Sequence, residues 1–352
     1  MTTSHTTTLT LPSTHQAIPP EAVPEKTIEL LNLNKRFGNK QAVFNLSFNV
    51  ERGSIFGFLG PNGSGKSTTI KMMCGLLQPS AGEIKLLGRN IKTDIHLIRQ
   101  HIGYMSQQFG LYPDLTVMQN LRFYAGLYGV RGKLFDERLA EVMALTNIEP
   151  YLKFRAGHLS GGWKQRLALG CAIIHKPYVI FLDEPTAGID PVARRDLWDL
   201  LFDLSSQGVT LFVTTHYMDE AERCHKVGYI YEGQLIAFGT SDELRKLDSV
   251  NPDNSRRLML LCDPLMKAYR DLNHVAHILD VTIFGNELHL LLDNSWDETQ
   301  LASWLTERGF EIHQLKPIEP SLEDVFVALT QAAQRRQLTG EPRGEGASIP
   351  HD

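Results

Sequence analysis

A glycine-rich loop between a strand and a helix is the feature of this sequence that most constrains its fold. Residues 60–68 read Gly-Pro-Asn-Gly-Ser-Gly-Lys-Ser-Thr, the pattern G-x-x-x-x-G-K-[ST], between an apolar strand expected at 55–59 and a helix expected to begin at Lys66. Glycines let backbone N–H groups turn towards phosphate oxygens, and the helix N-terminus favours the same negative charge. The alternative is a Gly-rich turn before an ordinary helix, which the strand-loop-helix context disfavours. The loop therefore predicts binding of a nucleoside triphosphate.

Individual residues of this loop have expected contacts. Lys66 should reach the β- and γ-phosphates, and the Ser67 hydroxyl should coordinate Mg²⁺. The loop residues expected to bind the nucleotide are Gly60, Pro61, Asn62, Gly63, Ser64, Gly65, Lys66, Ser67 and Thr68.

Composition limits the partners and the setting of the chain. Its 352 residues are enough for two domains, and its formal net charge of −5 gives no reason to expect a nucleic-acid partner. Four cysteines, at positions 74, 171, 224 and 262, form neither a C-x-x-C pair nor a zinc-ligand spacing, which fits a reducing cytoplasm. No window approaches the ~18 apolar residues of a membrane helix, so we do not expect the chain to span a bilayer.

Both ends of the chain are polar. Residues 1–25 are rich in Thr, Ser and Pro and lack a basic start followed by an apolar stretch, so we expect a disordered N-terminal lead and no signal peptide. Residues 333–352 are polar with Gly and Pro, which predicts a disordered tail.

The pattern from residue 26 to 247 predicts an α/β core. Apolar strands are expected at 54–59, 178–182, 209–214 and 227–231, and helical stretches separate them, which favours a mainly parallel sheet. Residues 28–37 and 42–50 instead alternate apolar and polar residues around a Gly-Asn turn at 38–39, which predicts an antiparallel β subdomain. Helical spacing over 114–158 predicts an inserted helical lobe of two or three helices.

Residues 255–330 have a different organisation. Strands are expected at 257–262, 276–284, 287–292 and 311–315, and helices at 264–272 and 297–308. This order, β-α-β-β-α-β, is the ferredoxin-like split unit. A last helix is expected at 321–330, after Pro320 and a Ser cap. Nothing in this second, α+β domain has a catalytic pattern, so we expect it to regulate or dimerise the chain.

Two acids follow an apolar strand downstream of the loop. Residues 179–184 read Val-Ile-Phe-Leu-Asp-Glu, which places Asp183 and Glu184 at the C-terminal end of a parallel strand beside the phosphates. Asp183 should hold Mg²⁺ through water, and Glu184 should polarise the attacking water. A buried strand followed by a solvated acidic turn is the alternative for this segment taken alone.

A second phosphate-binding turn follows the helical lobe. Residues 159–166 read Leu-Ser-Gly-Gly-Trp-Lys-Gln-Arg, in which Ser160, Gly161 and Gly162 suit contact with a triphosphate at a helix N-terminus. One chain cannot easily bring both turns to one γ-phosphate. The economical arrangement is two copies, head to tail, with nucleotides between them.

These motifs together resemble the nucleotide-binding subunits of ABC transporters, over residues 27–247. The resemblance implies P-loop NTPase architecture, ATP and Mg²⁺ as ligands, and ATP-driven closure of a homodimer or heterodimer. It implies that Lys66 and Mg²⁺ neutralise charge, that Glu184 orients water, and that Ser160 acts from the opposing chain. It also implies that Phe37 stacks on adenine and that Gln107 links Mg²⁺ to the helical lobe. By the same resemblance, Ser160–Trp163 form the signature turn, Asp190 is the D-loop acid and His216 is the switch histidine.

Details of the motifs favour one branch of this family. Trp163 stands where Gln is usual in the signature, Gly188-Ile189 stands where Ala-Leu is more frequent in the D-loop, and residues 320–326 read Pro-Ser-Leu-Glu-Asp-Val-Phe. All three resemble the branch that exports drugs or antibiotics through separately encoded membrane subunits. The resemblance therefore implies an integral membrane permease as partner and a position at the cytoplasmic face of the inner membrane.

Two other classes remain open at this point. A soluble ABC ATPase acting on nucleic acid or ribosomes usually has a long coiled-coil insertion or two cassettes in one chain, and this sequence has neither. A non-catalytic regulatory partner would be favoured if Glu184 or His216 were altered, but both are present. The transported substance is not encoded in these motifs.

Overall fold

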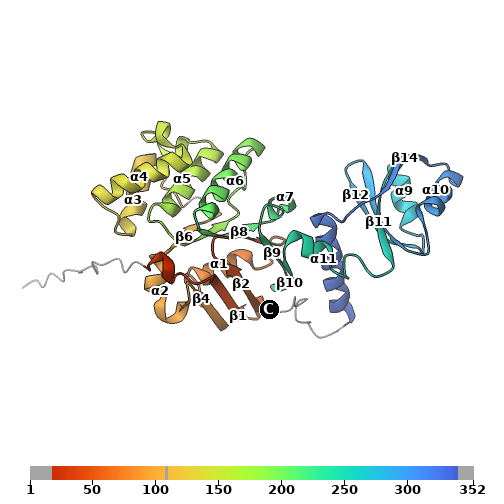
Figure 1. Cartoon of the computed structure of the whole chain (residues 1–352), viewed down its shortest axis with the longest axis horizontal. Helices are drawn as coiled ribbons and strands as arrows, with labels where there is room; N and C mark the ends of the chain where they lie inside the picture. The colour runs from red at the N-terminus through yellow and green to blue at the C-terminus, as the bar shows by residue number, and fades with distance from the viewer. Residues whose placement is uncertain (1–17, 108–109, 340–352) are drawn as a thin grey trace, which may run out of the picture. The chain divides into compact units, whose positions relative to one another are not determined.

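The computed structural model describes residues 18–107 and 110–339 (Figure 1). By its internal contacts the chain divides into two compact units. The first unit takes the described residues of Met1–Asn39, Asn45–Ile55 and Ser67–Thr214, and the second takes those of Lys40–Phe44, Phe56–Lys66 and Thr215–Asp352. Each unit is described by itself below.

Three parallel strands form the centre of the first unit: β6 (Ile102–Met105), β7 (Val179–Asp183) and β8 (Thr210–Thr215). Every residue of β7 and β8 is buried, as a parallel sheet covered on both faces requires. The register pairs Val179 with Thr210 and Asp183 with Thr214, so the two strands end at the same edge. The predicted strands at 178–182 and 209–214 are confirmed, and their register brings a hydroxyl beside the first acid.

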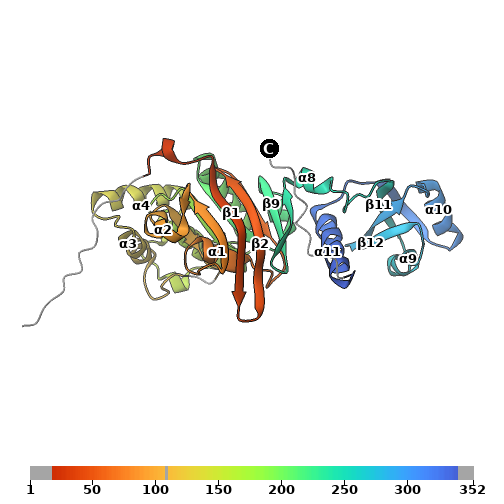
Figure 2. The same cartoon turned by 90° about the horizontal axis from the view of Figure 1, so that it is seen from below.

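An antiparallel sheet of order β2-β1-β4-β5 is the second layer of the first unit (Figure 2). Its strands are β1 (Lys26–Phe37), β2 (Lys40–Glu51), β4 (Ala81–Leu86) and β5 (Arg89–Asn90). The sequence predicted β1 and β2, and it missed β4 and β5, which are short. Helix α2 (Ile91–Arg99) follows, and the Asn90 side chain caps it by accepting from the Lys92 N–H.

Residues 18–25, which the sequence assigns to a disordered lead, are ordered in the structure. They contain the short 3₁₀ turn η1 (Pro20–Ala22), and the side chains of Ile18 and Val23 are buried. The Tyr178 hydroxyl donates to the carbonyl of Ile18 at 2.6 Å. The burial of these two apolar side chains explains why the segment is ordered. The sequence did not reveal this order because the segment is too short to show an apolar pattern. Residues 1–17 lie outside the described residues.

Helices fill the stretch predicted as a helical lobe. It contains α3 (Val117–Leu127), α4 (Lys133–Thr146) and the 3₁₀ turns η2 (Glu149–Tyr151) and η3 (Ala156–His158), followed by α5 (Gly161–Ile173) and, beyond β7, α6 (Pro191–Ser206). Thr116 and Gln119 form a capping box at the start of α3. A Cβ atom on Gly170 would lie 3.0 Å from Val142 and 3.4 Å from Leu121, so α5 packs closely on α4 and α3.

In the second unit, strand β3 (Ile55–Leu59) pairs in parallel with β9 (Lys226–Tyr231), which pairs antiparallel with β10 (Gln234–Gly239). Helix α1 (Lys66–Met73) begins after the glycine-rich loop, and its residues from Ser67 on belong to the first unit. The short helices α7 (Met218–Ala221) and α8 (Ser241–Arg245) flank the β9–β10 hairpin in sequence. The predicted strand-loop-helix order is confirmed.

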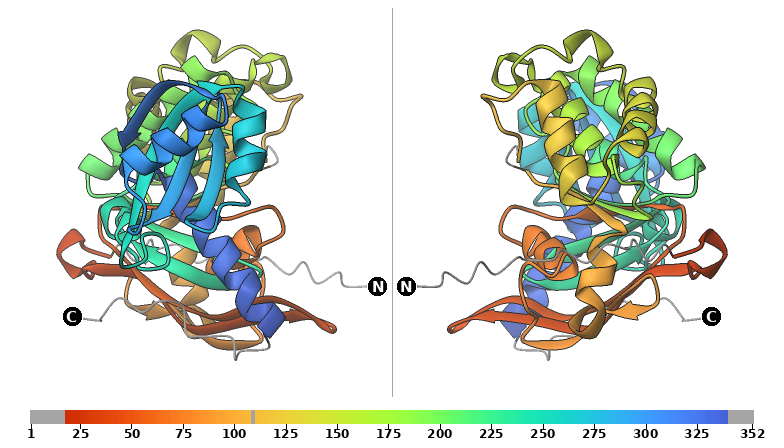
Figure 3. Two further views of the ribbon diagram at one scale, coloured as in Figure 1. Left: turned by 90° about the vertical axis from the view of Figure 1, so that its right-hand side faces the viewer. Right: turned by 90° about the vertical axis from the view of Figure 1, so that its left-hand side faces the viewer.

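The C-terminal part of the second unit is a ferredoxin-like α+β fold, as predicted. Its elements are β11 (Ser255–Asp263), α9 (Leu265–Leu272), β12 (Ile278–Phe284), β13 (Glu287–Asp293), α10 (Glu298–Glu307) and β14 (Glu311–Pro317), with sheet order β12-β13-β11-β14 and antiparallel neighbours (Figures 1 and 3). Leucines of β11 and β13 pack with Ala268, Leu272, Leu301 and Leu305 of α9 and α10 in one core.

The last helix, α11 (Leu322–Thr339), is longer than predicted, since the sequence favoured an end at residue 330 and a disordered tail from 333. Residues 331–339 read Gln-Ala-Ala-Gln-Arg-Arg-Gln-Leu-Thr, mostly good helix formers, which explains the continuation despite their polarity. Residues 340–352 lie outside the described residues. The Phe326 ring of α11 lies 4.3 Å from that of Tyr229 in β9, and the Thr330 hydroxyl is 2.9 Å from the Tyr229 hydroxyl.

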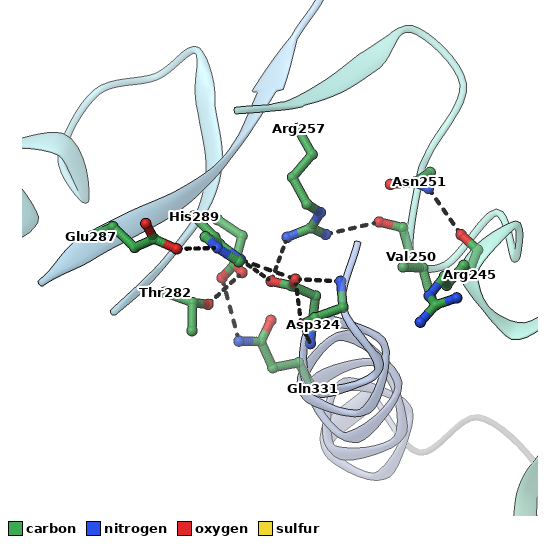
Figure 4. A network of polar contacts seen from close by, with 11 residues as sticks. Arg245, Val250, Asn251, Arg257, Thr282, Glu287, His289, Asp324 and Gln331 are labelled. Carbon is green, nitrogen blue, oxygen red and sulfur yellow. Dashed lines mark hydrogen bonds and ion pairs between the residues drawn. The ribbon is translucent and has the colours of Figure 1, made fainter. Parts of the chain in front are cut away.

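A buried ion pair joins α11 to the C-terminal sheet (Figure 4). The Asp324 carboxylate, whose side chain is fully buried, lies 3.0 Å from Nη1 of Arg257 and 3.1 Å from Nδ1 of His289. It also accepts from the N–H and hydroxyl of Ser321, which closes the first turn of the helix. Arg257 donates with its other terminal nitrogen to the carbonyl of Val250. Asp324 therefore links helix α11 to the C-terminal sheet, and through Arg257 to the linker before β11.

Replacing Asp324 with Ala should lower the free energy of unfolding by about 3–5 kcal/mol, because it leaves a buried guanidinium without its counter-charge. Urea denaturation followed by tryptophan fluorescence measures this. Glu141→Ala is the control: Glu141 pairs with Arg138 and Lys176 at the surface, where such pairs contribute about 0–1 kcal/mol. Equal effects of the two substitutions would contradict a stabilising buried pair.

Candidate functional site

The glycines of the loop have conformations and contacts that other residues cannot adopt. Gly63 and Gly65 have φ angles of +81° and +111°. A Cβ atom on Gly60 would lie 2.2 Å from the carbonyl oxygen of Ile230, and one on Gly65 would lie 2.7 Å from that of Ala42. The loop therefore rests on the backbone of the β9–β10 hairpin and of β2, in a curve suited to an anion.

Lys66 is buried inside its own loop. Its side-chain ammonium donates to the carbonyls of Gly60 at 2.7 Å and Pro61 at 3.1 Å, and the residue is 5% exposed. The Ser64 carbonyl accepts from the Gly233 N–H at 2.9 Å, which ties the loop to the hairpin turn. These contacts hold a positive charge within the curve of the loop.

Ser67, the next residue in the chain, belongs to a cluster of polar side chains in the first unit. Its hydroxyl donates to Oδ1 of Asp183 at 3.1 Å. The Gln107 amide donates to Oε2 of Glu184 at 2.8 Å. Asp183 and Glu184 are 3% and 8% exposed, so both carboxylates are held in a largely water-excluded site. Burial and the Asp183 carboxylate together raise the pKa of the neighbouring Tyr104 phenol.

Sequence reasoning missed Thr214 as a member of this cluster. Its hydroxyl donates to Oδ1 of Asp183 at 2.7 Å and accepts from the Glu184 N–H at 3.0 Å. The available signal was a hydroxyl residue at the end of a buried strand expected to lie parallel to the strand that ends at Asp183. The structure thus brings Ser67, Gln107, Asp183 and Glu184 together, with Thr214 among them.

The signature turn is held against the D-loop. Ser160 is the N-cap residue of α5, where it is exposed and makes no side-chain capping bond. A Cβ atom on Gly162 would lie 2.7 Å from Cβ of Ala193, and one on Gly161 would lie 3.3 Å from the carbonyl oxygen of Gly188. The two glycines therefore allow the start of α5 to approach the start of α6.

Asp190 and Trp163 have structural partners as well. The Asp190 carboxylate caps α6, since its Oδ1 accepts from the N–H groups of Val192 and Ala193, both at 3.0 Å. The Trp163 ring lies 4.3 Å from that of Tyr151. Packing on η2 thus gives a reason for tryptophan at this position of the signature.

His216 and Phe37 are the residues that the resemblance assigns to the γ-phosphate and to the adenine. The His216 ring packs 4.2 Å from that of Tyr217, and the Thr215 hydroxyl fixes the turn by donating to Glu220 at 2.7 Å and accepting from the Tyr217 N–H. Phe37 is 49% exposed. An exposed aromatic ring is compatible with a stacking platform.

Comparison with known proteins agrees with this geometry. Residues 43–187 match the model of the family described as ABC transporter. The chain is 35% identical over 305 residues to the linearmycin resistance ATP-binding protein LnrL of Bacillus subtilis, covering 85% of this chain and 96% of LnrL. It is 40% identical over 309 residues to the Nod factor export ATP-binding protein I of Paraburkholderia xenovorans, covering 88% and 98%.

The chain belongs to the family of ABC transporter ATP-binding proteins. It is also 48% identical over 234 residues to the probable multidrug ABC transporter ATP-binding protein YbhF of Escherichia coli, a match that covers 66% of this chain and only 40% of YbhF. These relatives carry the names of an exporter branch, as the motif variants predicted.

Solved structures resemble the cassette part of the chain. An ATP-binding subunit of an ABC transporter has 30% sequence identity and a TM-score of 0.58, covering 62% of this chain and 92% of that subunit. A dimeric post-hydrolysis cassette, MJ0796, bound to ADP and Pi, has 27% identity and a TM-score of 0.56, covering 60% and 98%. Within the described residues, no helix has the length and apolar character needed to cross a membrane.

Replacing Gly60 with Ala should weaken ATP binding by about 10–100-fold, because the added methyl group meets a backbone oxygen and such overpacking costs about 1–3 kcal/mol. Equilibrium binding of a fluorescent ATP analogue measures the loss. Gly126→Ala is the matched control, since a Cβ atom there meets nothing within 4 Å and lies in α3. Wild-type affinity in a folded Gly60→Ala protein would contradict the contact with Ile230.

Proposed function

We propose that this chain hydrolyses ATP to drive export of a substrate through a separate membrane permease. The observation that carries the proposal is the buried cluster of Ser67, Asp183, Glu184 and Gln107, because Ser67 is joined directly to Lys66 of the phosphate loop. A nucleotide seated on the loop would thus present its terminal phosphate to two oriented carboxylates.

The residues around the carboxylates fit Mg²⁺. A hydroxyl and a carboxylate 3.1 Å apart, Ser67 and Asp183, are hard oxygen donors of the type that magnesium prefers together with water and phosphate. When bound, Mg²⁺ would neutralise part of the phosphate charge. We infer that Ser67 ligates it directly and Asp183 through water, with Gln107 at the same site.

The chain's own groups would then carry the chemistry. The Lys66 ammonium, held in the loop, stabilises the negative charge on the transferred phosphoryl group. Glu184 orients the attacking water, and its hydrogen bond to Gln107 fixes the carboxylate. We assign His216 to the γ-phosphate and Phe37 to the adenine, by their positions in the ordered motifs. Hydrolysis by in-line attack of water follows.

A second copy of an ATPase chain would complete the site. Ser160 is exposed at the N-terminus of α5, where backbone N–H groups and the helix dipole attract an anion. The similar cassette MJ0796 forms a dimer in its post-hydrolysis state. We propose a head-to-tail homodimer or heterodimer in which Ser160, Gly161 and Gly162 contact ATP on the facing chain, with Asp190 beside them.

Replacing Glu184 with Gln should slow hydrolysis by at least about 100-fold while ATP binding persists, because the carboxylate acts on water and not on the nucleotide. ATP should then accumulate in a stable dimer, measurable by analytical ultracentrifugation with ATP and Mg²⁺. Adding Ser160→Arg to the same chain should abolish the dimer and leave the fold intact. A monomeric Glu184→Gln protein with normal turnover would overturn the proposed function.

The helical lobe offers a surface for the permease. Tyr112, Phe123 and Leu127 are 46%, 39% and 65% exposed, and the rings of Tyr112 and Phe123 pack edge to face at 4.8 Å. An exposed apolar patch of this kind marks an interaction site. We infer that a membrane subunit docks here and holds the chain at the cytoplasmic face of the inner membrane. Phe109, near Tyr112 in the sequence, lies outside the described residues.

Replacing Phe123 and Leu127 with Ser should leave the ATP turnover of the purified chain within about two-fold, because solvent-facing apolar groups contribute little to folding. The same change should remove the chain from the membrane fraction of its host, because these groups contribute to docking. Cell fractionation with immunodetection measures this. An equal change at two exposed polar positions, Glu137→Ser and Lys133→Ser, is the control. Membrane association unchanged by the first pair would refute the docking surface.

We infer that residues 255–330 modulate hydrolysis or dimer formation. Helix α11 contacts Tyr229 in β9, and β9 pairs with β3, the strand that leads into the phosphate loop. This is a continuous path of packed groups within one unit. The Asp324→Ala protein, whose C-terminal fold should be loosened, serves as the test. A regulatory role would be excluded if this variant kept the basal turnover, the ATP affinity and the dimerisation of the wild-type chain.

The alternative, action on nucleic acid or ribosomes, has no support from the relatives reported above, whose names refer to multidrug transport, resistance and export. The net charge of −5 also offers no long-range attraction for a polyanion. The transported substance would be selected by the membrane partner.

A further inference from the structure

Thr214 contacts both carboxylate residues of the cluster and has no assigned role. It is the fifth position of β8, is fully buried, and lies opposite Asp183 in the parallel register. We propose that Thr214 is a positioning residue for hydrolysis, which sets the orientation of the Asp183 carboxylate and of the Glu184 backbone at once. The proposal rests on the proposed ATPase function.

The hydroxyl of Thr214 forms hydrogen bonds with both carboxylate residues, besides a longer contact of 3.5 Å with the carbonyl oxygen of Leu182. Its O–H donates to Oδ1 of Asp183 at 2.7 Å, and its oxygen accepts from the Glu184 N–H at 3.0 Å. Oδ1 of Asp183 is also the atom that accepts from Ser67. Two donors on one oxygen fix the rotation of the carboxylate, so its other oxygen has a defined direction.

The Glu184 backbone needs this support. Glu184 has a φ angle of +51°, a left-handed conformation that is unfavourable for residues other than glycine. Its N–H is shared between the Thr214 hydroxyl and the Thr214 carbonyl oxygen at 3.2 Å, and its carbonyl accepts from the Ala187 N–H at 3.1 Å. The turn after β7 therefore holds a strained residue whose N–H lies against Thr214, while its carboxylate accepts from the Gln107 amide.

Valine at position 214 would keep the shape and the β-branch but remove both hydrogen bonds. Asp183 would then lose the donor at 2.7 Å, and the Glu184 N–H would lose the shorter of its two contacts with Thr214. Both carboxylates would sample wrong orientations, which lowers metal affinity and turnover. The hydrogen bonds described above hold the Lys66 ammonium on loop carbonyls and the loop on Gly233, so nucleotide binding without metal should persist.

The test compares Thr214→Val with Thr214→Ser, which retains the hydroxyl, and with Thr210→Val as a matched control. Thr210 is equally buried in the same strand, about 13 Å away along β8, and its hydroxyl bonds to Thr27 and to the Gly53 N–H. The control thus loses buried hydroxyl bonds without touching either carboxylate. Circular dichroism and thermal unfolding establish which variants are folded.

Two measurements decide the proposal: the Kd of Mn²⁺ in the presence of a non-hydrolysable ATP analogue, by electron paramagnetic resonance, and kcat and KM for MgATP. We expect Thr214→Val to weaken Mn²⁺ binding about 10-fold and to lower kcat at least about 10-fold, as loss of hydrogen bonds to a charged group implies. The affinity for the analogue in EDTA should stay within two-fold. Thr214→Ser should restore both values, and Thr210→Val should change neither.

The proposal is overturned if folded Thr214→Val keeps wild-type Mn²⁺ affinity and kcat, if Thr210→Val loses as much, or if serine fails to rescue. Should valine prevent folding, Thr214→Ala is measured against Ser in the same way. A wild-type chain without ATPase activity would instead refute the proposed function, while its Mn²⁺ Kd would still report on Thr214.

Discussion

Burial of charge beside fixed hydrogen-bond partners is the constraint on which the functional part of this structure depends. Lys66, Asp183 and Glu184 are all less than a tenth exposed, and an unpaired charge in such a place would cost several kcal/mol. Each has its own compensation: loop carbonyls for the ammonium, hydroxyls for one carboxylate and an amide for the other. The donors that satisfy these charges also orient them, so the protein's own groups arrange the site.

Much of this arrangement could be predicted from the sequence. The phosphate loop and the paired acids carry strong local patterns, and the ferredoxin-like order follows from period-2 strands and the Gly285-Asn286 turn between two of them. Strands β4 and β5 were missed because β4 has only two large apolar residues, Ile84 and Leu86, and β5 has only two residues. The end of α11 was misplaced because polarity suggested disorder where helix propensity prevailed. Thr214 was overlooked since only the strand register, a tertiary property, reveals its partners.

Motif residues also have structural contacts that a motif alone does not predict. One carboxylate oxygen of Asp190 caps α6 by accepting from two backbone N–H groups. The two signature glycines allow the start of α5 to approach the D-loop closely. The Arg166–Asp196 pair at 2.8 Å adds a polar contact between α5 and α6. The signature and the D-loop are therefore packed against each other, and we expect a movement of either to affect the other.

The β9–β10 hairpin receives contacts from two directions. Gly233 and Ile230 support the phosphate loop, while Tyr229 packs on Phe326 of the last helix. The hairpin is therefore constrained by two neighbours that are distant in sequence, and its substitutions must be compatible with both. A chimaera that exchanges C-terminal regions between members of this family separates the hairpin from one of these neighbours wherever the crossover lies, so the hairpin must match the phosphate loop of one parent and the last helix of the other.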